Sequence, residues 1–329
     1  MVRATLSVLT ARKSAGGLGM RAVVLNSRGC NRSPVTTPKL YNAGTTDDIR
    51  TAVLWIAKNF PESPIFGIGF SLGANAMTKY VGEEGDACPL TAAVVLANPW
   101  DFVRSARHIE SATLMNKYIY KNVMGGAVRS LVARHREAFL DCPNPPLPAD
   151  VVDDLIKKRF VSLRYFDNTV TAPVFGFANA DHYYASVSSS RFVASVRIPL
   201  LGLNAEDDPV IGDEALPQAE ILMNPWVYVV RTAHGGHLGW FEKGPDGALR
   251  RWYVRPVREY FEALLDYNMA PRPRVPFHEE DGRVTRTDRP DISFYELDAK
   301  GLPQGTNVEE STSAIPFASR IMRKLFTGW

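Results

Sequence analysis

The sequence predicts an α/β protein with a mostly parallel sheet flanked by helices, and two observations support this fold class. Short apolar runs alternate along the chain with segments whose apolar residues recur at helical spacing, which is the pattern of strands joined by helices. One of these strand-to-helix junctions, at residues 69–73, carries a glycine-rich turn. The 329 residues, 45% of them hydrophobic, are enough for a large core.

The first third of the chain reads as a regular alternation of elements. Threonines and aspartates at residues 45–48 are good helix caps, Pro61 is a helix breaker, and the residues between them have helical spacing. The expected elements are a helix over residues 2–13, a strand over 20–25, a helix between 47 and 60, a strand over 64–68, a helix over 74–81 and a strand over 92–97.

The alternation stops after Trp100 and resumes near residue 198. The intervening stretch contains helical patterns at 106–123, 127–139 and 148–160, followed by an aromatic-rich stretch at 165–184, from which we expect Phe175, Phe177, Tyr183 and Tyr184 to line a pocket. Strands are expected at 198–204 and 226–230, and a helix at 249–267. We therefore divide the chain into a first core part (1–102), an inserted cap (103–190), a second core part (191–269) and a C-terminal extension (270–329).

The segment Gly69-Phe70-Ser71-Leu72-Gly73 has the G-x-S-x-G pattern of a nucleophile elbow. Such a turn is so tight that the residues two before and two after the serine must be small, and it lifts the serine hydroxyl above the carboxyl edge of the sheet. The alternative is a glycine-rich turn that only packs closely. The pattern alone does not decide between them.

A serine nucleophile needs a base and an acid later in the chain, in the order Ser, Asp, His. The strand at 198–204 runs into Asp207 and Asp208, and the strand at 226–230 into His234 and His237. We expect Asp207 as the acid, because it comes just past the strand, and His237 as the base, because His234 is too close to its strand. Asp208 and His234 are the alternatives. A metal site at the histidine pair is the weaker interpretation, since no further ligand stands at suitable spacing.

Composition narrows the function classes. A net charge of +3 without a basic aromatic stripe argues against nucleic acid. Three widely spaced cysteines favour a reducing, cytoplasmic compartment over a disulfide framework. No run is long enough to span a membrane. The basic amphipathic end at residues 315–329 docks on the protein's own body or, alternatively, lies on a membrane or lipid-droplet surface.

The segments containing Ser71, the two aspartates and the two histidines, together with NSRGCNRSPVTTPKLYNAGTTDDIR and AAVVLANPW, resemble one group of α/β-hydrolases. This group (AB hydrolase 4) includes bacterial hydrolases of the YheT type, abhydrolase-domain lipases and fungal medium-chain fatty-acid ethyl ester synthase/esterases. The resemblance implies Ser71 as nucleophile, Asp207 as acid and His237 as base. It also implies ester or acylglycerol substrates, acyl transfer to an alcohol in some members, and no cofactor.

The sequence departs from this group at its N-terminus. The relatives have strands ahead of the first helix, and the loop after one of these strands supplies half of the oxyanion hole, whereas this sequence starts at the helix that follows the loop. The donor that we expect in this chain is the N–H of Leu72, at the head of the helix behind Ser71. The alternative function is therefore a catalytically impaired relative that binds acyl groups or associates with membranes.

Overall fold

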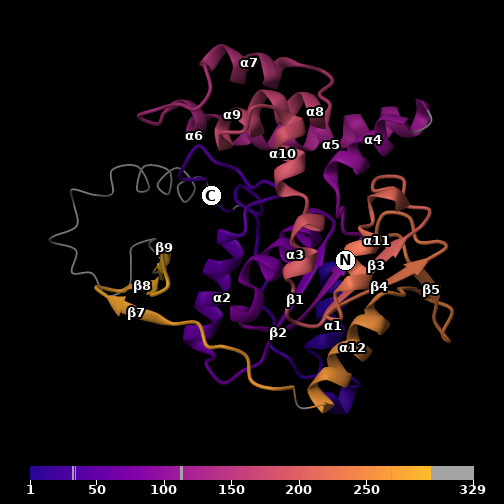
Figure 1. Ribbon diagram of the computed structural model, residues 1–329. Coiled ribbons are helices and arrows are strands. Elements are labelled where there is room, and N and C mark those ends of the chain that lie inside the picture. The colour runs from indigo at the N-terminus through magenta and orange to yellow at the C-terminus, as the bar shows by residue number, and fades with distance from the viewer. Residues whose placement is uncertain (32, 34, 112–113, 268, 298–329) are drawn as a thin grey trace.

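A parallel sheet of four strands, in the order β1-β2-β3-β4, forms the centre of the molecule (Figure 1). The computed structural model describes residues 1–31, 33, 35–111, 114–267 and 269–297. The strands of this sheet are β1 (Ile65–Phe70), β2 (Leu90–Leu96), β3 (Leu200–Ala205) and β4 (Val227–Thr232). Two smaller antiparallel sheets consist of β5 (Phe241–Lys243) with β6 (Leu249–Arg251), and of β7 (Phe277–Glu280), β8 (Arg283–Arg286) and β9 (Arg289–Tyr295).

Helices surround the sheet in three groups. On its two faces lie α1 (Val2–Leu9) and α12 (Val254–Asp266) on one side, and α2 (Asp47–Asn59) and α3 (Leu72–Glu84) on the other. Figure 1 shows the helices between β2 and β3 gathered above one end of the sheet, namely α4 (Phe102–Ser111), α5 (Leu114–Arg134), α6 (Arg136–Leu140), α7 (Ala149–Lys157), α8 (Leu163–Phe166), α9 (Ala172–Phe175) and α10 (Ala180–Val187). The short helix α11 (Gln218–Met223) precedes β4.

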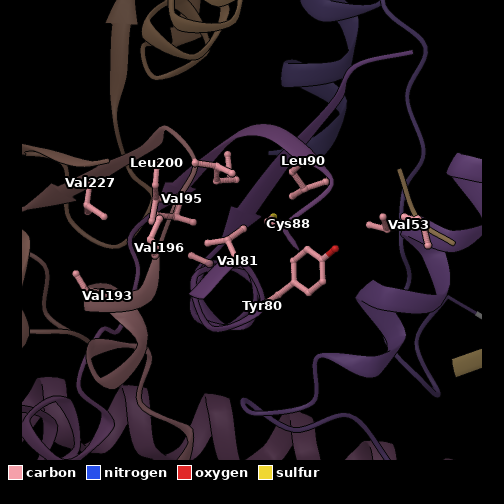
Figure 2. Packing of buried hydrophobic residues seen from close by; sticks show 14 of the residues in the cluster. Val53, Tyr80, Val81, Cys88, Leu90, Val95, Val193, Val196, Leu200 and Val227 are labelled. Atoms are coloured by element: carbon pink, nitrogen blue, oxygen red, sulfur yellow. The ribbon is translucent and has the colours of Figure 1, made fainter. Parts of the chain in front are cut away.

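Both faces of the sheet are buried, which explains why its strands read as continuous apolar runs. Alternate residues of β2 point to opposite faces: Ala93 and Val95 pack with α2 and α3, whereas Val94 and Leu96 pack with α1 and α12. Figure 2 shows the first of these layers, in which Tyr80 and Val81 of α3 lie against the sheet. The predicted parallel α/β core is therefore confirmed.

The predicted strand over residues 20–25 is wrong. This segment pairs with no strand of the described chain, and the side chains of residues 23–25 are about half exposed (48%, 47% and 49%). β-branched residues favour extended backbone, but a strand exists only where a neighbour takes up its N–H and C=O groups. At the other end, residues 249–251 form β6 rather than the first turn of a helix.

The antiparallel sheet β7-β8-β9, within the predicted C-terminal extension, is tied to the core by buried ion pairs. Glu84 of α3 accepts from Arg50 of α2 at 2.7 Å and from Arg286 of β8 at 2.9 Å, and all three side chains are at most 5% exposed. Thr46, expected to cap α2, donates its hydroxyl to Glu83 instead. Burial disfavours the charged guanidinium of Arg286, but hydrogen bonds to Asp288 and Glu84 outweigh it, so the pKa of Arg286 is raised.

None of the described helices combines the length and the apolar character that a bilayer crossing requires. The predicted amphipathic end at residues 315–329 lies outside the described residues.

Replacing Arg286 with methionine should destabilise the protein strongly. The substitution removes one of the two cations that Glu84 contacts while that carboxylate stays buried, and losing a partner in a buried pair costs about 2 to 4 kcal/mol. Arg274→Met is the matched control, because Arg274 pairs with Glu62 in solvent at 75% exposure and an exposed pair contributes at most about 1 kcal/mol. Urea unfolding measures both; equal losses would contradict the buried role of Arg286.

Candidate active site

Ser71 occupies the sharp turn between β1 and α3. Its backbone has φ +51° and ψ −120°, a region that residues with a side chain rarely adopt, and its N–H donates to the carbonyl of Leu96 on β2 at 2.9 Å. A Cβ on Gly69 would lie 2.5 Å from the carbonyl oxygen of Gly73, so only glycine fits there. At Gly73 a Cβ would meet nothing within 4 Å, so glycine itself is not required at this position. The close contact lies on the strand side of the turn.

His237 follows β4 and reaches Ser71 across the sheet. Its Nε2 lies 2.8 Å from the Ser71 Oγ, so the structure brings together the two residues expected as nucleophile and base. The His237 ring is about one-fifth exposed. His234, the alternative base, has 92% of its side chain exposed, and its Nδ1 lies 3.5 Å from Asp207 Oδ2.

The carboxylate that contacts His237 is Asp208, which corrects the choice of Asp207. Asp208 Oδ2 lies 2.9 Å from His237 Nδ1, and its Oδ1 accepts the N–H groups of Val210 and Ile211. Only 3% of Asp208 is exposed. Asp207 instead accepts the Gly236 N–H at 2.7 Å and is 45% exposed.

The physical reason for this correction lies in where strand pairing ends. The Glu206 N–H still donates to the Thr232 carbonyl, one residue beyond β3, and the turn closes only with the Asp208 N–H on the Ala205 carbonyl. The aspartate that points toward His237 is therefore Asp208 rather than Asp207.

Leu72, the expected oxyanion donor, is the first residue of α3 and borders the same cavity as Ser71 and His237. The Ser71 carbonyl accepts from Ala74 and Asn75, so the Leu72 N–H stands ahead of the first intrahelical bonds. The positive end of a helix dipole favours negative charge at this point.

A mostly apolar cavity of about 420 Å³ opens over Ser71 and His237, roofed by the helices between β2 and β3. Of the four aromatic residues expected to line a pocket, Phe175, Tyr183 and Tyr184 line this one, whereas Phe177 packs against His182 and Tyr183. Sequence reasoning missed the contribution of α4 and α5, whose side chains at Phe102, Ala106, Ile109, Met124, Val128 and Leu131 also line it. Helical spacing on α4, at positions 102, 106 and 109, was the available signal.

A comparison with protein families gives a match over residues 9–244 to the family described as alpha/beta hydrolase fold. The matched range includes the elbow, both aspartates and the histidine loop. This chain belongs to the alpha/beta hydrolase fold family.

Individual members of this family that resemble the chain are named as lipases and esterases. It is 39% identical to a monoacylglycerol lipase of Saccharomyces cerevisiae over 74% of this chain and 53% of the yeast protein. It is 36% identical to medium-chain fatty acid ethyl ester synthase/esterase 2 of the same yeast, over 73% of this chain and 55% of that protein. It is 32% identical to the mouse phospholipase ABHD3, over 76% of this chain and 58% of that protein. The chain thus spans a little over half the length of these relatives.

Within the described residues, no three histidine, cysteine, aspartate or glutamate side chains come together in a way that could hold a metal ion. The groups that the structure does bring together are the Ser71 hydroxyl, the His237 imidazole and the Asp208 carboxylate.

One wall of this alpha/beta hydrolase cavity carries a second buried carboxylate, Asp167, on a short π-helical segment (Asp167–Thr171) between α8 and α9. Thr171 and Tyr184 each donate a hydroxyl hydrogen bond to it at 2.7 Å. Burial raises the pKa of Asp167, and the two hydroxyl bonds oppose that shift only in part. Desolvation also raises the pKa of Tyr184, so the phenol stays a donor.

Asp167 should make stability depend on pH. Because its pKa is raised in the folded state, Asp167 stays protonated to a higher pH in the folded protein than in the unfolded chain. The stability that this difference contributes is therefore lost as pH rises from about 4 through the folded pKa. Asp167→Asn removes the titration, so the variant should gain stability relative to the unsubstituted protein over that interval. Urea unfolding at a series of pH values tests this; parallel curves for the two proteins would contradict it.

Proposed function

We propose that this chain is a serine carboxylic ester hydrolase, a lipase or esterase that acts on medium-chain fatty-acid esters or acylglycerols through an acyl-enzyme. The observation that carries the proposal is the unbroken line of contacts from Asp208 through His237 to Ser71, at 2.9 and 2.8 Å, beneath an apolar cavity. Each member of this line has the partner that its role requires.

In the proposed reaction the Ser71 Oγ attacks the ester carbonyl while the His237 Nε2 takes the serine proton. Asp208, which accepts from Nδ1, holds the tautomer that leaves Nε2 free and stabilises the imidazolium that forms. The imidazolium then gives its proton to the departing alcohol, leaving the acyl group on Ser71. A water molecule, deprotonated by His237, releases the fatty acid.

The developing oxyanion is stabilised by the Leu72 N–H in this proposal. That amide lies at the head of a 13-residue helix, where both the free N–H and the dipole favour negative charge. One such donor contributes about 100- to 1000-fold in rate.

The size and lining of the cavity favour an apolar acyl group as the part of the substrate that it holds. Its volume lies in the range of small-ligand sites, and leucine, valine and phenylalanine side chains dominate its wall. The printed names of the relatives, a monoacylglycerol lipase and a medium-chain ethyl ester synthase/esterase, favour the same substrate class. An alcohol that enters in place of water would receive the acyl group by the same steps, so we include acyl transfer in the proposal.

A lipid substrate also favours contact with a membrane or lipid-droplet surface. We propose this contact, with a cytoplasmic location, since the three cysteines are free thiols, as in a reducing compartment.

Ser71→Ala should abolish turnover of a medium-chain p-nitrophenyl ester and covalent labelling by a fluorophosphonate. Removing the nucleophile of a triad costs about 10⁶-fold in kcat. The assay compares the two purified proteins, with circular dichroism to establish that both are folded. Equal turnover would refute Ser71 as nucleophile, and a folded unsubstituted protein with neither turnover nor labelling would favour the acyl-binding alternative.

Asp208→Asn should lower kcat about 10⁴-fold, because an amide at this position favours the wrong imidazole tautomer while preserving the shape of the site. The loss should appear in kcat rather than KM, since Asp208 is buried behind His237. Steady-state kinetics on the same ester measures it. A loss below tenfold would show that another group orients the ring.

A further inference from the structure

The backbone around His237 is held in an unusual conformation. His237 stands between Gly236, with φ +51°, and Leu238, with φ +67°. Leu238 carries a side chain and is buried, so its left-handed backbone is strained and persists only because its surroundings hold it. The position of the imidazole therefore depends on contacts made to its neighbours' backbone.

Two side chains make such contacts, one on each side of His237. The Asp207 Oδ1 accepts the Gly236 N–H at 2.7 Å, and Arg251 of β6 donates from Nη1 to the Leu238 carbonyl at 2.9 Å. The Arg251 guanidinium also lies over the Phe241 ring at 4.2 Å, which fixes its direction. Asp207 and Asp208 thus contact the histidine loop together, the first at its backbone and the second at its ring.

We propose that Asp207 and Arg251 are positioning residues that hold the backbone on either side of His237, so that its ring meets Ser71 and Asp208 at once. This inference rests on the proposed function, because it concerns the same histidine. Neither residue touches the reacting atoms; each acts through the loop. The contribution of Asp207 is the hydrogen bond that its oxygen accepts, and its charge is not required.

The surface pair between Asp207 and His234 does not explain the placement of Asp207. The two groups are 3.5 Å apart and the His234 side chain is 92% exposed, so their attraction is screened by solvent. The Gly236 contact is shorter, at 2.7 Å, and it joins Asp207 directly to the backbone beside His237.

Asp207→Ala should lower kcat for the p-nitrophenyl ester about 10- to 100-fold, with KM unchanged, as expected when a catalytic group shifts by about 1 Å. Asp207→Asn should restore kcat to within about threefold of the unsubstituted protein, because the amide oxygen can accept the same hydrogen bond. If Asp207→Asn loses as much as Asp207→Ala, or if Asp207→Ala loses nothing, the proposal is overturned.

Two further variants sharpen the test. His234→Ala removes the exposed partner of Asp207 and should leave kcat unchanged. If this variant loses as much kcat as Asp207→Ala, the effect of Asp207 arises from its pair with His234, and the proposal is overturned. Arg251→Met removes the donor on the other side of the loop and should lower kcat as Asp207→Ala does. Full activity in this variant overturns the proposal even if Asp207→Ala fails to fold.

Proton NMR of the full chain separates this inference from the proposed function. The His237 Nδ1 proton, bonded to Asp208, should give a far-downfield signal that requires no ester turnover. We expect the signal in the unsubstituted protein and in Asp207→Asn, and its loss through exchange with water in Asp207→Ala. If this pattern of signals appears in a protein that shows no turnover, the positioning role holds and the proposed function fails. If the signal is unchanged in Asp207→Ala, only the positioning role is overturned.

Discussion

The parallel register of β1, β2, β3 and β4 is the constraint on which the rest of the site depends. Phe70 pairs with Leu96, Leu96 with Leu203, and Ala205 with Thr232, so the loops that carry the serine, the aspartates and the histidine leave the sheet at the same edge. A slip of one residue would turn each side chain to the opposite face. The burial of both faces makes such a slip expensive, because it would place apolar residues of β2 and β3 against the wrong helices.

Sequence reasoning selected Ser71 and His237, which the structure places 2.8 Å apart, but it chose the wrong one of two adjacent aspartates as the partner of His237. Ser71 could be recognised because the backbone of its turn excludes a Cβ at position 69. This local steric requirement is visible in the sequence as a glycine two residues before the serine. Which aspartate contacts His237 depends on how far pairing between β3 and β4 continues, and Glu206 extends it by one residue. Strand ends are uncertain by more than one residue from sequence, and here one residue decides which carboxylate is buried.

The errors in the fold prediction share a cause: the conformational preference of a segment does not show which other segment it will pair with. Residues 20–25 have the composition of a strand and pair with none of the described strands, whereas the charge-rich segment 277–295 forms a sheet. In that sheet Arg286 is as buried as an apolar residue because Glu84, some 200 positions earlier, is there to receive it. No window of sequence contains both members of that pair.

The line of contacts from Asp208 to Ser71 and the wall of the cavity come from different parts of the described chain. All three groups in the line from Asp208 to Ser71 come from loops of the four-stranded sheet, whereas most of the cavity wall comes from α4 to α10. Two buried carboxylates near the cavity, Asp208 and Asp167, follow the same division. Asp208 contacts an imidazole and backbone amides, whereas Asp167 contacts two hydroxyls among the helices between β2 and β3. Changes in the helices between β2 and β3 can therefore reshape the cavity without disturbing the strand register that aligns Ser71, His237 and Asp208.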